Sequence, residues 1–421
     1  MRRTRRLAAA AALVVASLLM TGCGRSDESA AGPAEATALG SGKASGTVTL
    51  WAMGTEGELL PEFVKTFEQE NPGVDVEVTA IPWDAAHNKF QTAIAGGQTP
   101  DMAMMGSTWM TDFGSAFATV PTDLDTSGFF PGAVQSTQVN GRAAGVPWYV
   151  DTRVLYYRTD LAAAAGWTKP PATWDELHQM ASDMKSKAGA EWGIRMPAGN
   201  DSYQGSLWMP LSNGATLTDG SKWTLDTPQQ VEAYEYYNSF FTDKLSNPDT
   251  DISPGAAEAD FVSGATPMFI EGPFMRSQLA KLGGEGFDQK YASAVLPTKV
   301  SSTSFSGGAN LVVFDQSKNK DAAWRLVQWL SDPKTQVSWY QTSTDLPASQ
   351  QAWQDPSLSG DANLAVFGEQ LKTAVAPPAN PTWTQVAAAG DTELEKIRRG
   401  QESVQDGLKA LQQQADAIGL G

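Results

Sequence analysis

Residues 145–157 bring together side chains that could bind a ligand. Gly145 and Pro147 punctuate the backbone, which predicts a bend at the start of the segment. The β-branched, aliphatic and aromatic residues 154–157 predict a short buried strand. Between them lie two aromatic rings, a carboxylate and a guanidinium, which belong to Trp148, Tyr149, Asp151 and Arg153. Flat rings stack on apolar C–H faces and ionised groups form strong hydrogen bonds to hydroxyls, so the combination suits a sugar. The segment fits equally well a strand entry whose rings are core and whose Asp151–Arg153 pair lies on the surface.

The elements that precede this segment alternate between strands and helices. Strands are predicted at 47–53, 74–78 and 102–105, and helices with one apolar face at about 59–67 and 85–95. Strand–helix–strand–helix–strand with short loops predicts a parallel α/β sheet.

Polar and aromatic side chains follow each of these three strands. Open α/β sheets bind ligands at the carboxyl ends of their strands. The loops there, the first of them expected as a turn over 54–57, carry Thr55, Glu56, Trp83, Asp84, Ser107, Thr108 and Trp109. A single Trp more often indicates packing, but three such loops on one sheet edge, together with Trp148 and Asp151, favour a binding site.

Further helices and strands are predicted along the rest of the chain. Thr173 and Glu176 have capping-box spacing at the start of a helix whose apolar face runs to Met184. Other helices are predicted at about 231–241, 321–330 and 404–418, the last behind a Ser403 cap, and strands at 267–270, 291–296 and 310–314.

The length and charge of the chain limit what it can be. A chain of 421 residues is too long for one ordinary core and predicts two domains of roughly 150–180 residues each. Hydrophobic residues make up 41% and the mean hydropathy is −0.29, as in soluble globular proteins. The formal net charge of −17 excludes nucleic acid as a partner, because binding to phosphates needs the opposite sign.

The first 23 residues predict export and a lipid anchor. A basic start, MRRTRR, precedes an apolar run over 7–20, which is too short to span a bilayer comfortably. The run ends in LLMTGC, which resembles the lipobox of bacterial lipoproteins, with Met20 where Leu is usual. We therefore expect residues 1–22 to be a signal peptide and Cys23, the only cysteine, to be lipidated. An ordinary signal peptide with an incidental cysteine is the alternative, and the export route, general or twin-arginine, stays open.

Residues 24–46 are rich in Ser, Gly, Ala and Glu and have no periodicity. Such a composition cannot bury a core, so we expect the stretch 23–46 to be a flexible tether that begins at the lipidated Cys23. An anchored tether would place the globular part outside the cytoplasmic membrane.

Most catalytic signatures are missing from the sequence. The two histidines, His87 and His178, lack metal-ligand spacing with any other His, Cys or acid, and are expected on the solvated surface. There is no phosphate-binding Gly-rich motif and no G-x-S-x-G elbow, so no cofactor or metal is expected. A glycoside hydrolase needs only two carboxylates and aromatic subsites, so this enzyme class stays open.

The order of motifs carries a family resemblance over nearly all of residues 47–418. The motifs are VTLWAMGTEG, FEQENPGVDVEVTAIPWDAAHNKFQTAIAGGQTPDM, GVPWYVDTRVLYYRTDL, PPATWDEL, FVSGATPMFIEGPF, GGANLVVFDQSKNKDAAWRLVQWLSDPKTQ and GQESVQDGLKALQQQ. Together they resemble the family 1 extracellular solute-binding proteins of ABC importers.

The resemblance implies a two-lobed periplasmic-binding-protein fold of type II, with the ligand in a cleft between the lobes. Each lobe is expected to hold a mainly parallel sheet flanked by helices. The implied N-terminal lobe is 47–147 plus 308–347, and the implied C-terminal lobe is 148–307 plus 348–421. The segments 145–151 and 305–310 are expected to cross between the lobes as a hinge.

The resemblance also implies roles for individual residues. By similarity to maltose-type members, Thr55, Glu56, Trp83, Asp84, Thr108 and Trp109 face a sugar from the first lobe. Asp151 matches a hinge carboxylate that contacts the ligand. Phe274 stands where many members have a stacking Trp, so one subsite is expected to be weaker or different. Three further ligand contacts are expected from Trp208, Asn310 and Trp383.

The sequence thus predicts a monomeric, lipid-anchored receptor that captures a sugar, expected to be an oligosaccharide, and delivers it to a membrane permease without chemistry. The alternatives are a secreted glycoside hydrolase and a binding lipoprotein for a non-sugar solute such as a polyamine or glycerophosphate. An anion site would need more Lys or Arg than the loops carry, and the fourteen tryptophans favour a sugar.

Overall fold

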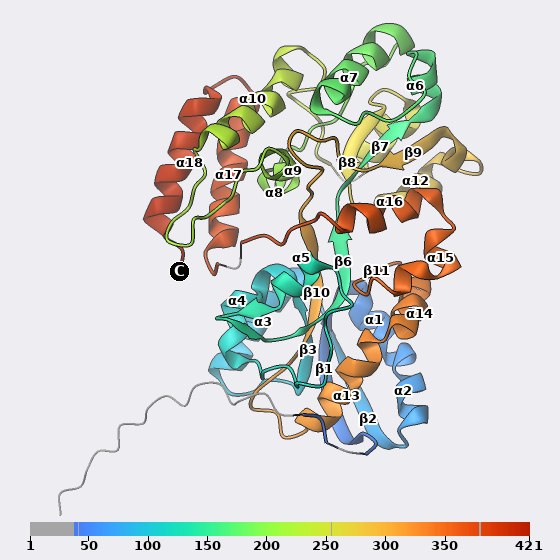
Figure 1. The fold of residues 1–421 in the computed structure, drawn as a ribbon, viewed down its shortest axis with the longest axis vertical. Coiled ribbons are helices and arrows are strands. Elements are labelled where there is room, and N and C mark those ends of the chain that lie inside the picture. Colours follow the sequence, from blue (N-terminus) through green and yellow to red (C-terminus); the bar gives the residue numbers. More distant parts are fainter. Residues whose placement is uncertain (1–37, 41, 254, 379) are drawn as a thin grey trace, which may run out of the picture. The chain divides into compact units, whose positions relative to one another are not determined.

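The computed structural model describes residues 38–40, 42–253, 255–378 and 380–421 (Figure 1). The predicted signal peptide, the lipidation site Cys23 and most of the predicted tether lie outside the described residues. Among those described, no helix combines the length and the apolar character that crossing a bilayer requires.

The larger sheet has six strands in the order β11-β6-β10-β3-β1-β2. They are β1 (Ser45–Met53), β2 (Gly73–Ile81), β3 (Met102–Gly106), β6 (Val146–Thr152), β10 (Ser306–Val313) and β11 (Leu346–Pro347). The first three strands are parallel, as the sequence predicts. The other three pair antiparallel with their neighbours, so the sheet is mixed and the expectation of a mainly parallel sheet is too simple.

The bend expected at Gly145 and Pro147 is wrong, because β6 begins at Val146 and contains Pro147. Proline has no N–H to donate to a β-ladder and tends to occur at irregularities. Here the register between β6 and β10 shifts between Ala309 and Asn310, next to Pro147. The predicted boundary between residues 147 and 148 therefore falls inside one strand, and the domain limits and the hinge stay predictions.

The helices that cover this sheet are α1 (Gly54–Phe63), α2 (Lys65–Glu70), α3 (Trp83–Ala95), α4 (Met110–Phe113), α5 (Pro131–Ser136), α13 (Lys320–Ser331) and α14 (Pro333–Ser343). Of these, α3 and α13 lie close to the predicted positions, whereas the single helix predicted at about 59–67 is divided into α1 and α2. A short hairpin pairs β4 (Gln138–Val139) with β5 (Arg142–Ala143). The turn expected over 54–57 is wrong because α1 begins directly at Gly54, with Glu56 in its first turn, where the helix dipole favours an acid.

The smaller sheet has three strands in the order β8-β7-β9, namely β7 (Val154–Arg158), β8 (Met268–Glu271) and β9 (Tyr291–Ala294). Both neighbours run antiparallel to β7, so the expected parallel arrangement is wrong for this sheet. The apolar runs that predict these strands do not report strand direction, since both directions satisfy the same backbone groups.

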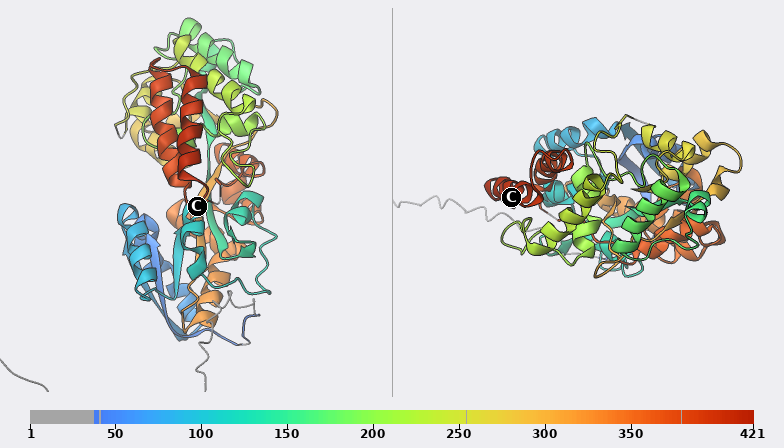
Figure 2. Two further views of the ribbon diagram at one scale, coloured as in Figure 1. Left: turned by 90° about the vertical axis from the view of Figure 1, so that its left-hand side faces the viewer. Right: turned by 90° about the horizontal axis from the view of Figure 1, so that it is seen from above.

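Helices also surround the smaller sheet. They are α6 (Thr159–Ala164), α7 (Trp174–Ala188), α8 (Ser202–Ser206), α9 (Trp208–Ser212), α10 (Pro228–Thr242), α11 (Ala256–Ser263), α12 (Met275–Gly283), α15 (Pro356–Ser359), α16 (Ala362–Leu371), α17 (Trp383–Arg398) and α18 (Val404–Ile418). The capping box of Thr173 and Glu176 is confirmed, as is the Ser403 cap of α18. In both Figure 1 and Figure 2, α17 and α18 pack side by side.

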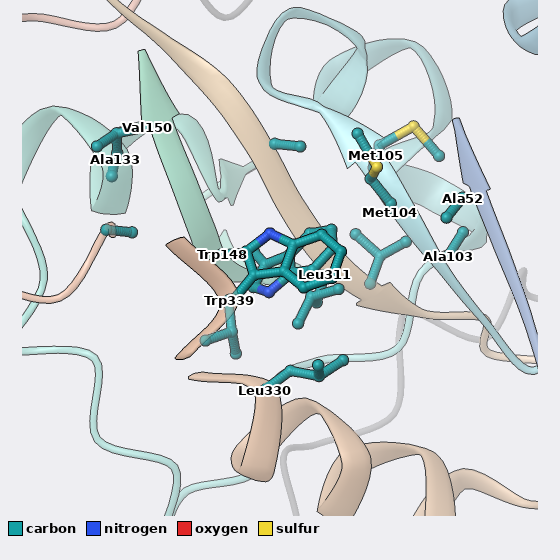
Figure 3. Close-up of a cluster of buried hydrophobic side chains, with 14 of the residues drawn as sticks. Ala52, Ala103, Met104, Met105, Ala133, Trp148, Val150, Leu311, Leu330 and Trp339 are labelled. Atoms are coloured by element: carbon teal, nitrogen blue, oxygen red, sulfur yellow. The ribbon is translucent and has the colours of Figure 1, made fainter. Parts of the chain in front are cut away.

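The buried apolar residues form two clusters. The larger one packs on the six-stranded sheet and extends to Tyr156, Phe269 and Tyr291 of the smaller sheet. It includes Trp148, whose ring stacks on Trp339 at 4.9 Å between centroids with 28° between planes (Figure 3). The smaller one contains Trp174, Trp208 and Trp383. Because the larger cluster reaches both sheets, the clusters do not mark the predicted domain limits.

Candidate functional site

Two tryptophans gather at the carboxyl ends of the three parallel strands. The rings of Trp83 and Trp109 meet edge to face, with 5.6 Å between centroids. Trp83 is 40% exposed and lies against the backbone of Gly54, where a Cβ atom would come within 2.7 Å of the indole. The absence of a side chain at Gly54 therefore leaves the room that the Trp83 ring occupies.

A carboxylate–phenol pair lies at the same sheet edge. Tyr149 on β6 donates its hydroxyl proton to Glu56 Oε1 on α1 at 2.8 Å. Burial, and after it the negative charge of Glu56, raises the pKa of Tyr149 well above its usual value. The hydroxyl therefore stays protonated and holds the Glu56 carboxylate at the first turn of α1.

A second carboxyl group, Asp345, lies close to this pair. Its Oδ2 accepts a hydrogen bond from the indole N–H of Trp339 at 2.9 Å. Burial, followed by the charge of nearby Glu56, raises the pKa of Asp345 to about 7. The sequence does not predict Asp345 as a site residue. Asp345 directly precedes β11, and only the pairing of β11 with β6 at Tyr149 brings it close to Glu56.

Asp151 near the end of β6 belongs to a second group of charged side chains, together with Arg153 and Glu271. Residues two apart in a strand share a face, which aligns Asp151 with Tyr149. Arg153 Nη1 donates to Asp151 Oδ2 at 2.5 Å, and its Nε lies 3.4 Å from Glu271 Oε2. Burial alone would lower the pKa of Arg153, but the charges of Asp151 and Glu271 raise it instead.

Gly272 packs directly against this group. A Cβ atom at Gly272 would lie 2.7 Å from Arg153 Nη1 and 2.9 Å from Asp151 Oδ1. Within the described part of the chain, Asp151 Oδ1 is buried and has no hydrogen-bond partner. Phe274, two residues further on, is 49% exposed, as a ring available to a ligand would be.

A pocket of about 330 Å³ opens beside Arg153. Its walls come from the loop and helix around α8, from the end of β8 with the start of α12, and from Phe305 just before β10. Residues that line it include Arg153, Gln204, Glu271, Phe274 and Phe305. Of these, the sequence points to Arg153 and Phe274 as binding residues and to Phe305 only as the start of a hinge segment. The FIEGPF motif could have indicated Glu271, because it places that acid three residues before Phe274.

Trp148 does not present its ring to a ligand in this structure, so the expectation from the sequence is wrong. Its side chain is 0% exposed and packs on Trp339 in the core. The alternation of a strand explains the error, because Trp148 and Val150 face the core while Tyr149 and Asp151 face the site. The Trp148 ring therefore fits the packing alternative, whereas a role of Asp151 and Arg153 in binding stays a prediction.

Three other predicted contact residues are also buried and therefore closed to a ligand in this structure. Trp208 lies in the smaller cluster, edge to face with Trp174. The amide of Asn310 donates to Ser136 Oγ at 3.0 Å inside the sheet. Trp383 is buried too, but its indole N–H donates to Gln204 Oε1 at 3.3 Å and so helps to orient a residue that lines the pocket.

The remaining predicted residues lie near the two tryptophans. Thr55 is exposed in the first turn of α1, and Ser107 and Thr108 are half-buried in the helical turn that leads to Trp109. Asp84 lies in the first turn of α3 by its backbone. His87 Nε2 pairs with Asp112 Oδ2 at 2.8 Å, and the described residues contain no group of three or more His, Cys, Asp or Glu that could hold a metal ion.

The fold and this site define a two-lobed α/β binding protein of the periplasmic type. The chain belongs to the bacterial extracellular solute-binding protein family, whose model matches residues 52–337. The family comprises sugar-binding proteins of ABC transporters, and its members are binding proteins rather than enzymes.

Solved structures and curated relatives agree with this assignment. The sugar-binding protein MalE of Xanthomonas citri is 30% identical with a TM-score of 0.84, over 89% of this chain and 97% of that one. The GacH receptor of Streptomyces glaucescens, solved unliganded and with acarbose, is 26% identical with a TM-score of 0.75, over 89% and 99%. A binding protein of Brucella abortus is 28% identical over 86% of this chain and 90% of its own length.

Proposed function

We propose that this protein is a lipid-anchored receptor that captures an oligosaccharide outside the cytoplasmic membrane and delivers it to the permease of an ABC importer. We also propose that the protein works as a monomer and performs no chemistry on the sugar. The ATPase that drives transport would be a separate chain.

One observation supports a sugar as the ligand: partly exposed aromatic rings and fixed hydrogen-bonding groups lie at the same edge of the six-stranded sheet. Trp83 and Trp109 offer ring faces or edges to the apolar C–H surface of a sugar. Glu56, held by Tyr149, and Asp151, held by Arg153, offer charge-assisted hydrogen bonds to hydroxyls. This pairing of flat apolar surface with oriented polar groups matches the two kinds of surface on a pyranose ring.

The ligand contacts that we propose come from both halves of the molecule. From the larger sheet they are Thr55, Glu56, Trp83, Asp84, Ser107, Thr108, Trp109, Tyr149 and Asp151. From the smaller sheet and its pocket they are Arg153, Gln204, Glu271, Phe274 and Phe305. Because Tyr149, Asp151 and Arg153 follow one another along β6 and just beyond it, one elongated ligand could contact both groups, as an oligosaccharide would.

Two carboxyl groups of the site, Glu56 and Asp151, are held in place by hydrogen bonds. A glycoside hydrolase needs one carboxyl to act as an acid and another free to act as a nucleophile or base. Here Glu56 accepts a hydrogen bond from the Tyr149 hydroxyl, and Asp151 is paired with Arg153. Both are held by hydrogen bonds that fix their orientation and keep them available as acceptors.

A thermal-shift screen of the mature protein tests the proposal. A ligand that binds only the folded state at about 100 times its Kd stabilises that state by about 2.7 kcal/mol. The panel holds mono- and oligosaccharides together with putrescine, spermidine and glycerol 3-phosphate. We expect at least one oligosaccharide to raise the Tm and the non-sugar solutes to leave it unchanged. A shift with a polyamine or glycerol 3-phosphate alone would contradict the proposal.

A further inference from the structure

We infer that the site selects saccharides without negatively charged groups, so that uronates, sulfated sugars and sugar phosphates are excluded. This inference rests on the proposed sugar-binding function and narrows it to a chemical class. It follows from how the charged residues of the pocket are already paired.

Arg153, the cation at the centre of the site, is neutralised by the protein. Asp151 Oδ2 accepts a hydrogen bond from Arg153 Nη1 at 2.5 Å, and Glu271 Oε2 lies 3.4 Å from Arg153 Nε. The guanidinium also lies over the ring of Phe305, 5.1 Å from the centroid. Two carboxylates and one guanidinium give this group a net negative charge, so Arg153 offers a ligand hydrogen bonds but no excess positive charge.

Arg195, the second arginine that lines the pocket, is engaged as well. Its Nη1 lies 3.5 Å from Asp260 Oδ2, and its Nη2 donates to the backbone carbonyl of Asp251. Nη1 is shielded from solvent, so a ligand in the pocket cannot reach it. Both arginines of the pocket are therefore already paired with acids of the protein.

Three acids of the site are not held in an ion pair, although the charge of Glu258 acts on Arg195. Asp201 and Glu258 line the pocket, and Glu56 accepts its hydrogen bond from a neutral phenol. Among the described residues none of the three forms an ion pair. A ligand carboxylate placed among them would lose its hydration and meet like charges, which is an efficient way to reject a competitor.

Matched probes test the inference. The parents are maltotriose, cellotriose and N,N′,N″-triacetylchitotriose. Each is compared by calorimetric titration with two derivatives that carry either a carboxylate or an amine at C6. For every parent that binds, we expect the carboxylate form to bind at least about tenfold more weakly than the parent. We expect the amine form to bind at least about tenfold more tightly than the carboxylate form.

The amine derivatives separate charge from size. If carboxylate and amine forms are rejected equally, steric exclusion at C6 explains the result and the inference is wrong. Binding of a carboxylate form as tight as that of its parent would also overturn the inference while leaving the sugar-binding function intact. If no saccharide of any charge binds, both the proposed function and the inference fail.

A variant tests the mechanism of selection. Glu271→Gln removes one partner of Arg153, so the affinity ratio of carboxylate form to parent should rise by about fivefold or more. Glu285→Gln makes the same change in charge at an exposed position outside the pocket, and its ratio should stay at the wild-type value. An unchanged ratio in Glu271→Gln, or an equal rise in both variants, would contradict the role given to the paired Arg153.

Discussion

Trp148 and Tyr149 are neighbours on β6, but their side chains serve different ends because they lie on opposite faces of the strand. Trp148 packs on Trp339 in the core, whereas the Tyr149 hydroxyl holds Glu56 at the site. At the scale of single residues, this alternation divides the effects of substitutions into those on stability and those on binding.

Two tryptophan substitutions should separate these effects. Trp148→Ala empties a buried site and should lower the free energy of unfolding by about 3–5 kcal/mol. Trp83→Ala removes a half-exposed ring and should cost little stability, but it should weaken oligosaccharide binding by about 2–4 kcal/mol, or roughly thirty- to several-hundred-fold. Denaturant melts and calorimetric titration measure the two quantities. Normal affinity in a folded Trp83→Ala protein would contradict its role as a ligand contact.

Asp345 should make stability depend on pH. Its pKa is about 7 in the folded protein, against 3.8 for an unperturbed aspartate, so the folded state binds more protons between these values. The contribution of the protonated group is therefore fully present below about pH 4 and is lost as the pH rises through 7. Over this window the loss is at most about 4 kcal/mol.

The Asp345→Asn variant should remove this dependence, because the amide oxygen can still accept the Trp339 indole proton without titrating. Urea melts of wild type and variant at pH 4.5 and 7.5 measure the difference. Asp75→Asn alters an exposed acid on β2 and serves as the control. A variant that keeps the wild-type slope would show that another group titrates.

At the scale of elements, the antiparallel pair of β6 and β10 positions the site. Gly308 on β10 has φ +118, and a Cβ atom there would lie 2.2 Å from the carbonyl oxygen of Tyr149. Only glycine fits both the backbone conformation and this close approach. The pair therefore depends on Gly308 for the alignment of Tyr149 and Asp151.

Gly308→Ala should destabilise the protein by more than about 1 kcal/mol and weaken ligand binding through the displaced strand. Its neighbour Gly307 is the matched control, because a Cβ atom there would meet nothing closer than 3.5 Å. Denaturant melts of both alanine variants compare the two positions. Equal stabilities would mean that β6 and β10 can move apart at no cost.

The elements were more predictable from the sequence than their pairing. Apolar spacing located α18, the strand β2 and the capped start of α7, because these features depend on local residues. The direction of β8 and β9 depends on long-range topology and was predicted wrongly.

The same distinction applies to the site. The loops after the parallel strands supplied Glu56, Trp83 and Trp109, since the carboxyl ends of such strands share an edge. Asp345 and Glu271 could not be found this way, because β11 and β8 bring them from positions far along the chain.

At the scale of the whole molecule, the proposed lipid anchor depends on Cys23. We expect the wild-type protein to be processed and recovered with membranes, and Cys23→Ser to be either released or left unprocessed, since serine cannot carry the thioether-linked lipid. Fractionation and mass spectrometry of the N-terminus check this, and Ser26→Ala in the predicted tether should remain anchored. A processed Cys23→Ser protein that still needs detergent for extraction would disprove lipidation.

The capture of an oligosaccharide without chemistry is tested most directly by titrating the mature protein calorimetrically with a sugar from the thermal-shift screen and then recovering that sugar for chromatography. We predict saturable binding of one sugar per protein, with the recovered sugar chemically unchanged after prolonged incubation. Hydrolysis that exceeds the amount of protein present would contradict this function and identify a glycoside hydrolase instead.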